Sequence, residues 1–188
     1  RGRLVFLTSP DGGESWSHST VISGDGSDNR NPAFGVSGKG TLLASFIKND
    51  SYVDGTLQRS KDPQPRPMYI SRSCDNGETW HTSLASVNGQ DSFGIGSPFG
   101  KMLTLEDGTI LMSYYNNDGS ASMIRSSDDG CTWVNPVRIT SEGNETSLCD
   151  LGDGHFIAVI RGPRSATWQS DSFDNGYTWG KTRRITDD

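Results

Sequence analysis

The most informative stretch of the chain reads Ser126-Ser-Asp128-Asp-Gly130-Cys-Thr132-Trp133, and its pattern occurs four times. The shared pattern is Ser-x-Asp-x-Gly-x-[Ser/Thr]-Trp, and the other copies begin at Ser9, Ser73 and Ser172. Four copies with five fixed points indicate an internal repeat. Each copy is typical of a hairpin turn, because Asp accepts hydrogen bonds from backbone N–H groups of its own turn and Gly supplies a positive φ.

Strand-like runs lie on both sides of each turn motif and between successive motifs. In the third unit, residues 101–105 and 109–114 precede the run 122–124, and the run 137–139 follows the motif. Because Gly-containing turns separate the runs, each complete unit predicts four antiparallel strands, which is the pattern of a propeller blade. We expect an all-β fold without helices, made of part of one blade and three full blades: residues 1–23, 24–87, 88–140 and 141–188.

Two residues of each motif are expected to be structural. The Asp fixes the turn, and the Trp leaves it as an apolar wedge that packs between neighbouring sheets. These eight residues are Asp11, Trp16, Asp75, Trp80, Asp128, Trp133, Asp174 and Trp179.

The composition argues against several classes of partner and cofactor. The formal net charge is −6 and the chain has no basic block, so nucleic acid is not the expected partner. No apolar run is long enough to span a membrane. The three His lie in different units without a partner at ligand spacing, so we expect no metal site and no cofactor. No secretion leader is visible, which leaves the localisation open, and the three unevenly spaced Cys predict free thiols.

The turn motif resembles the Asp box, or BNR repeat, of the sialidases (neuraminidases). The sequence between the motifs is also similar to the propeller domain of bacterial exo-sialidases, in Ser97-Pro-Phe-Gly-Lys101, in Asn144-Glu-Thr-Ser-Leu148 and at Arg161. The resemblance covers nearly the whole chain and implies a sialidase-like β-propeller of six four-stranded antiparallel blades, of which about three and a half are present. It also implies hydrolysis of a terminal α-linked sialic acid with retention, by a Tyr nucleophile that a Glu activates. Members of this family are often secreted.

The topology of such a disc separates its two faces. The turn motifs and the tight Gly turns share one face, the box face, whereas the long loops lie on the other, the loop face, where function is usually found. Glu145 enters the first strand of the fourth unit and Arg161 leaves its second strand, so strand pairing brings them near each other on the loop face. From the residues alone, a solvated ion pair remains the alternative. The resemblance implies that Glu145 is catalytic, activating the tyrosine, and that Arg161 binds the sialic acid carboxylate.

Weaker candidates lie in other loops of the same face. Asp28 and Arg30 enter the second unit, where the family places a substrate-contacting acid, but a plain loop acid and base beside Pro32 is an equally good interpretation. Phe93 either lines an acyl pocket or anchors its own loop. Further loop residues with a weaker claim are Asp50, Tyr52 and Asp54.

The family pattern extends beyond both ends of this sequence. The resemblance places the acid/base Asp and one Arg before the first motif, and the nucleophilic Tyr and a third Arg after the fourth, so the chain is expected to be a fragment or a truncated product. The expected partner is a sialylated or related glycan, and the uncovered blade faces predict self-association. Two alternatives stay open: a non-catalytic Asp-box propeller that binds a glycan or protein, and a gene fragment without a function.

Overall fold

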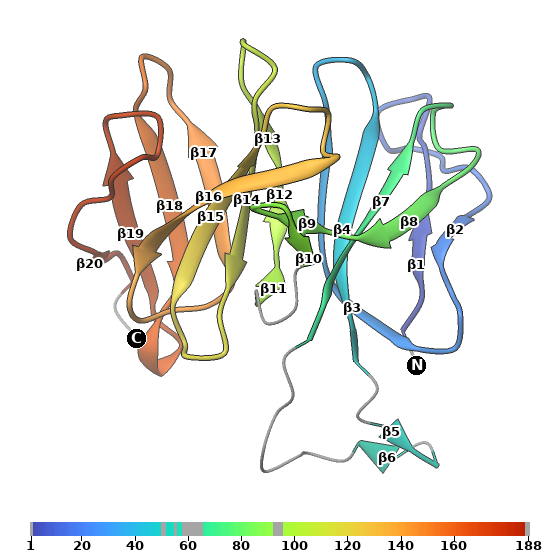
Figure 1. The fold of residues 1–188 in the computed structure, drawn as a ribbon, viewed down its shortest axis with the longest axis horizontal. Helices are drawn as coiled ribbons and strands as arrows, with labels where there is room; N and C mark the ends of the chain where they lie inside the picture. The colour runs from blue at the N-terminus through green and yellow to red at the C-terminus, as the bar shows by residue number, and fades with distance from the viewer. Residues whose placement is uncertain (1, 50–51, 55, 58–65, 92–95, 187–188) are drawn as a thin grey trace.

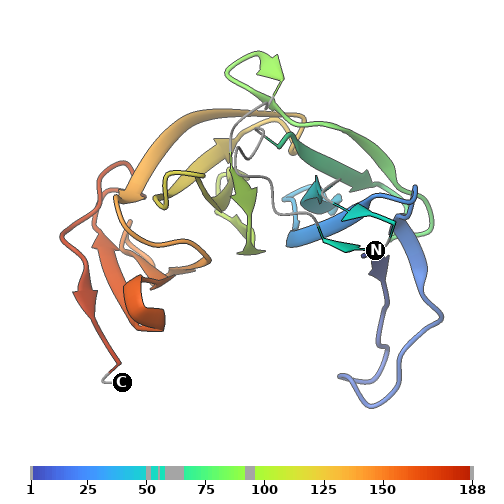
Figure 2. The same ribbon diagram turned by 90° about the horizontal axis from the view of Figure 1, so that it is seen from below.

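The computed structural model describes residues 2–49, 52–54, 56–57, 66–91 and 96–186. Its sheets stand side by side along an arc, with the two ends of the chain at the two ends of the arc (Figure 1; Figure 2). The all-β propeller architecture predicted from the sequence is confirmed. Helical structure among the described residues is limited to the short 3-10 turn η1 (Pro163–Ser165), and none of it has the length and apolarity that a membrane span requires.

Each complete blade is a sheet of four strands in chain order. The first, partial blade pairs β1 (Leu4–Phe6) with β2 (Thr20–Ser23). The second blade consists of β3 (Asp28–Val36), β4 (Leu42–Asn49), β7 (Met68–Ser73) and β8 (His81–Leu84). The third consists of β13 (Leu103–Thr104), β14 (Ile110–Tyr115), β15 (Ala121–Ser126) and β16 (Thr132–Thr140). The fourth consists of β17 (Thr146–Asp150), β18 (Phe156–Arg161), β19 (Thr167–Ser172) and β20 (Arg183–Arg184).

The third blade departs from a simple four-stranded sheet. Its first strand is interrupted: β11 (Ser97–Pro98) and β13 both pair with β14, while the intervening β12 (Gly100–Lys101) pairs in parallel with β3 of the second blade. A hairpin of β9 (Ser86–Val87) and β10 (Gln90–Asp91) extends the outer edge, because β9 pairs in parallel with β16. A separate small hairpin, β5 (Tyr52–Val53) with β6 (Thr56–Leu57), projects from the second blade (Figure 1).

The same four hydrogen bonds close every turn motif. The Ser hydroxyl donates to Asp Oδ1 at 2.7–2.8 Å and accepts from the Gly N–H at 2.7–2.9 Å. The later Ser or Thr donates its N–H to Asp Oδ1 at 2.8–3.0 Å and its hydroxyl to Asp Oδ2 at 2.5–2.6 Å. The Ser hydroxyl, both Asp carboxylate oxygens and the later Ser or Thr hydroxyl therefore all have partners within the motif, which makes the turn a rigid end for strands three and four of its blade.

The core lies between the blades, and the Trp of the second, third and fourth motifs packs toward the blade before it. Trp80 meets Phe6 of the first blade edge-on, with ring centroids 5.5 Å apart. Trp133 is fully buried in a cluster with side chains of the second blade, and Trp179 packs on a cluster that includes third-blade residues. Trp16 is 61% exposed, because the described chain has no blade before the first one.

The two faces of the arc differ as the topology requires. The turn motifs contact the tight turns of their own or a neighbouring blade, through Asn175 N–H to Gly154 O at 2.9 Å and Thr41 Oγ1 to Asp129 Oδ2 at 2.8 Å. The 116–120 turn and η1 lie at the opposite end of the strands, on the loop face, which is the lower side of Figure 1.

Candidate functional site

Glu145 and Arg161 meet on the loop face of the fourth blade. Arg161 ends β18 and Glu145 directly precedes β17, so the antiparallel ladder continues through them: the Arg161 N–H donates to Glu145 O at 2.9 Å. One step further, the Asn144 N–H donates to Arg161 O, also at 2.9 Å. With the backbones aligned, Arg161 Nη1 donates to Glu145 Oε2 at 2.8 Å. The position of this pair is therefore set by main-chain pairing.

The Arg161 guanidinium is accessible to a ligand. Its side chain is 55% exposed, while that of Glu145 is 29% exposed. The hydrogen bond that Arg161 donates to Glu145, and then the negative charge of that carboxylate, raise the pKa of Arg161 above its ordinary value. The guanidinium is thus a permanent cation, and its planar fork matches the two oxygens of a ligand carboxylate.

Tyr115 and Asn31 add two polar groups from other blades. Tyr115 ends β14 of the third blade, at the strand position that Arg161 holds in the fourth, and it contributes in the same direction to the raised pKa of Arg161. Asn31 of the second blade donates from Nδ2 to the Tyr115 hydroxyl at 2.5 Å. This bond joins the second and third blades through polar side chains.

Sequence reasoning missed Tyr115, although the repeat contains a signal for it. Tyr115 is the last residue of the second strand in the third blade, and Arg161 is the last residue of the second strand in the fourth. Equivalent positions of a propeller converge on one face, so an alignment of the units by strand would have marked it.

Asp28 and Arg30 form a pair at the start of β3. Asp28 is 4% exposed; one of its carboxylate oxygens accepts from the Gly2 N–H at 2.6 Å and the other from Arg30 Nε. Burial by itself raises the pKa of Asp28, but the bonds from Gly2 and Arg30 outweigh it and leave the pKa below its ordinary value. Each oxygen therefore accepts one bond from the protein, and the Arg30 side chain is 40% exposed.

The remaining sequence candidates contribute little to this geometry. Asp54 is exposed in the turn between β5 and β6; Tyr52 lies in β5, and the structure describes only its backbone. Asp50 and Phe93 lie outside the described residues. The three Cys are free and exposed, and within the described part of the chain no three His, Cys, Asp or Glu side chains gather as a metal site would require.

Comparison with known proteins places these features in a family. Residues 4–187 match the family described as "BNR repeat-like domain". A curated sialidase of Paraclostridium sordellii is 28% identical over 91% of this chain, and the chain spans 48% of that protein's length. The chain therefore covers about half of this curated relative.

Solved structures of low sequence identity share the fold. A variant of the NanB sialidase from Streptococcus pneumoniae superposes with a TM-score of 0.72 at 15% identity, over 96% of this chain and 46% of its own. An α-L-arabinanase of Penicillium chrysogenum, solved with arabinobiose, superposes with a TM-score of 0.57 at 21% identity, over 84% of this chain and 50% of its own. The chain therefore belongs to the BNR repeat-like domain family, and its fold is that of about half of a sialidase-type propeller.

Proposed function

We propose that this chain supplies one side of a glycosidase site that removes a terminal α-linked sialic acid with retention. In this proposal Arg161 binds the sialic acid carboxylate, and Glu145 activates a tyrosine nucleophile that another part of the complete site provides. The observation that carries the proposal is the pair itself: an exposed guanidinium and a half-buried carboxylate, fixed to each other by the pairing of β17 and β18 on the loop face.

The chemistry explains why these two residue types belong together. A tyrosine has a pKa of about 10, so it is a poor nucleophile unless a neighbouring base withdraws its proton. In this proposal Glu145 is that base, and Arg161 beside it holds the carboxylate in position through its hydrogen bond. Arg161 also holds the planar carboxylate of the sugar, which orients the anomeric carbon for attack. Asp28 and Arg30 are proposed as further substrate contacts from the second blade.

Binding of free sialic acid by this chain tests the role of Arg161. Saturation-transfer NMR on the parent chain is expected to show contact with the sugar, and Arg161→Ala is expected to remove it. Arg161→Lys keeps the charge without the fork and should retain only part of the signal. Arg183→Ala, on the exposed strand β20 of the same blade, is the matched control. Equal signals from Arg161→Ala and the parent would overturn the assignment.

Release of a fluorogenic sialoside tests hydrolysis. The assay is run on this chain and on any longer reading frame that contains it. Glu145→Gln is expected to abolish turnover by the active form while sialic acid binding persists, because the amide keeps the shape of the side chain but cannot take a proton. Turnover that survives Glu145→Gln would contradict the proposed role of Glu145.

A glycan-binding propeller without catalysis is the second candidate. The ion pair favours this candidate, because one oxygen of the Glu145 carboxylate already accepts a hydrogen bond from Arg161. A carboxylate paired in this way can bind a glycan without acting as a base. The two functions differ in one result: a binding module retains the glycan and never releases the fluorophore, in any reading frame.

We further propose that the chain self-associates through its uncovered blade faces. Apolar side chains are exposed on the first blade at Val5 and Val21, and on the fourth blade at Val159. Uncovered sheet faces of this kind attract partners.

A further inference from the structure

The dipeptide Asn-Gly occurs three times in the chain, beginning at Asn76, Asn88 and Asn175, and it has a reactivity of its own. The backbone nitrogen of the glycine can attack the side-chain amide carbon of the preceding asparagine, because glycine has no Cβ to crowd the approach. The structure places the three copies in two environments. Asn76 and Asn175 lie in turn motifs, whereas Asn88 lies in the turn between β9 and β10.

The two motif copies are blocked by the hydrogen bonds of the motif itself. The Gly77 N–H donates to Ser73 Oγ at 2.8 Å, and the Gly176 N–H donates to Ser172 Oγ at 2.9 Å. Both glycines are buried. A nitrogen whose proton is held by an acceptor in this way cannot turn toward the neighbouring amide carbon unless the motif opens first.

The turn at Asn88 and Gly89 has the opposite properties. Both residues are exposed, and both have positive φ (+50° and +75°), as a two-residue hairpin turn requires. Within the part of the chain that the structure describes, the Gly89 N–H has no hydrogen-bond acceptor, and a Cβ at Gly89 would have no atom within 4 Å. Two residue pairs close the β9–β10 hairpin, so it opens locally at low cost. The attacking nitrogen is therefore available and has room to move.

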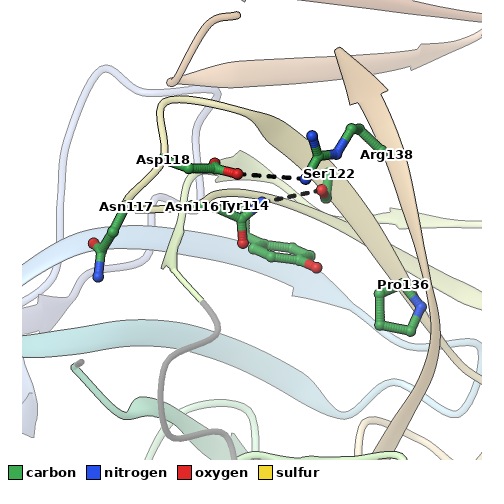
Figure 3. Close-up of a pocket in the computed structure, with 7 residues that line it drawn as sticks. All are labelled: Tyr114, Asn116, Asn117, Asp118, Ser122, Pro136 and Arg138. Atoms are coloured by element: carbon green, nitrogen blue, oxygen red, sulfur yellow. Dashed lines mark hydrogen bonds and ion pairs between the residues drawn. The ribbon is translucent and has the colours of Figure 1, made fainter. Parts of the chain in front are cut away.

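The amide oxygen of Asn88 is held by a donor from β16. The Asn135 N–H donates to Asn88 Oδ1 at 3.2 Å, just beyond the point where β9 and β16 pair in parallel. This N–H is available because β16 bulges there: Val134 and Val137 are three residues apart, whereas their partners on β15 are two apart. Figure 3 labels Pro136, which follows Asn135 in the bulge. Negative charge develops on Oδ1 when the amide carbon is attacked, so this donor stabilises the transition state as an oxyanion hole does.

We propose that Asn88 is a site of self-catalysed deamidation in the folded chain. The Gly89 nitrogen forms a bond to Asn88 Cγ while the bond from Cγ to Nδ2 breaks, and Nδ2 leaves as ammonia with the proton of the Gly89 N–H. Water then opens the resulting succinimide ring at either carbonyl and gives an aspartyl or an isoaspartyl residue. Water is the co-reactant, and no electrons are transferred. Neither residue belongs to the candidate site, so the reaction does not depend on the proposed function.

The isoaspartyl product changes the fold locally. It adds a methylene group to the main chain of a two-residue turn, so the turn no longer matches the register of Val87 with Gln90. It also replaces a neutral amide with a carboxylate. We expect β10 to separate from β9 in the modified chain, while β16 keeps its pairing with β15.

Incubation of the folded chain at mildly alkaline pH, with tandem mass spectrometry of its peptides over time, tests the site. Conversion at Asn88 is expected to be at least about tenfold faster than at Asn76 or Asn175, which is a barrier lower by about 1.4 kcal/mol. The same chain in guanidinium chloride is the control, and there the three sites should convert at similar rates. Equal rates in the folded chain, or a lead of Asn88 that persists in denaturant, would overturn the proposal.

Ser73→Ala tests why the motif copies are protected. The substitution removes the acceptor of the Gly77 N–H, so conversion at Asn76 is expected to rise toward the rate at Asn88. Asn175 lies in an unchanged motif of the same chain, and its slow conversion shows that the fold is retained. If Asn76 stays as slow as Asn175, the bond to the serine does not protect the asparagine, and the structural reason given for the reactivity of Asn88 is wrong.

Discussion

The glycine of the turn motif does more than permit the turn, because it touches the blade before it. A Cβ at Gly130 would lie 2.8 Å from Leu43 Cδ2, and one at Gly176 would lie 2.9 Å from Met123 Sδ. Gly130 also has φ +75°, a region that L-residues avoid. The motif glycine is therefore required twice, once by the backbone of its own turn and once by packing between blades.

Gly130→Ala is expected to destabilise the chain by about 2–5 kcal/mol, from about 1–2 kcal/mol for the left-handed backbone and about 1–3 kcal/mol for overpacking. Gly89→Ala is the matched control, since Gly89 has the same φ of +75° and no atom within 4 Å of its added Cβ. Gly89→Ala should lose only the stability that comes from the left-handed backbone conformation. Urea unfolding followed by circular dichroism measures both, and equal losses would show that the contact with Leu43 is unimportant.

The motif carboxylates also predict how stability depends on pH. Hydrogen bonds from the later Ser or Thr, through its hydroxyl first and then its N–H, lower the pKa of Asp11, Asp75 and Asp174 from 3.8 to about 2. Because the folded pKa lies below the unfolded one, these groups contribute their full stability above about pH 4 and lose it as the pH falls toward 2. Melting temperatures between neutral pH and pH 2 should therefore fall most steeply in that window.

Asp75→Asn is expected to flatten that acid-dependent fall, since the amide cannot titrate. Asp153→Asn is the control: Asp153 is exposed at φ +51°, a conformation that Asn tolerates. A curve for Asp75→Asn that keeps the parent's slope below pH 4 would rule out the motif carboxylates as its cause.

At the residue scale, the sequence predicted what is local. The bonds among Ser, Asp and Thr of one motif span four residues, so the pattern alone is enough to indicate them. The pattern also indicated that a motif Trp can pack between neighbouring sheets and that an incomplete ring of blades leaves such side chains uncovered; Trp16 is 61% exposed.

At the scale of elements, neighbouring blades are joined by an arginine just before the motif. Arg72 of the second blade binds Asp129 in the motif of the third blade. Its Nε donates to Asp129 O at 3.1 Å, and its Nη2 donates to Asp129 Oδ2 at 2.7 Å. Arg125 holds the same position at the junction of the third and fourth blades. Its Nη2 donates to Asn175 O at 2.6 Å, which corresponds to the bond from Arg72 to Asp129 O. No bond corresponds to the one from Arg72 to the Asp129 carboxylate, and the buried Nη1 of Arg125 has no hydrogen-bond partner. The second junction therefore lacks the carboxylate that the first one has.

Asn175→Asp is expected to supply that carboxylate and to stabilise the chain by about 1 kcal/mol, or about 2–4 °C in melting temperature. The backbone is compatible, since Asn175 has φ +59° and the equivalent Asp129 has φ +66°. Asn76→Asp is the matched control, because it changes the same position of the second motif. The residue of the preceding blade that corresponds to Arg125 is there Thr8, so this substitution should not change stability. A gain in both variants, or in neither, would disprove the arginine contact as the cause.

Element boundaries were predicted less well where long-range pairing intervenes. Residues 101–105 were expected as one strand, but Gly100 has φ +80° and the segment beside it pairs with β3 of another blade, which divides the strand. The β9–β10 hairpin was not foreseen either, because its support comes from β16, far along the chain. Alternation within a run predicts a strand but not the partner it will pair with.

At the scale of the molecule, the candidate site separates into a part that one hairpin defines and a part that the whole arc defines. Glu145 and Arg161 could be paired from sequence because β17 and β18 are consecutive antiparallel strands. Tyr115 and Asn31 meet each other only because successive blades curve about one centre, and that curvature depends on packing between sheets. The geometry of a site assembled in this way changes with the relative positions of the blades, and a partner bound at the ends of the arc would alter those positions.

Apolar side chains are exposed at both ends of the arc, and they predict self-association. Val5 and Val21 face each other across β1 and β2 and are 43% and 49% exposed, and Val159 of β18 is 38% exposed. Burying such faces is favourable by about 25 cal/mol per Å² of apolar surface, so the chain is expected to associate with itself at tens of micromolar in light scattering coupled to size exclusion. Val21→Glu and Val159→Glu should each shift the equilibrium toward monomer, whereas Leu151→Glu, in an exposed turn of the box face, should not. A parent chain that remains monomeric across that concentration range would refute self-association. If the monomer instead binds a further blade added as a separate polypeptide, the uncovered faces are contact surfaces for the rest of a propeller.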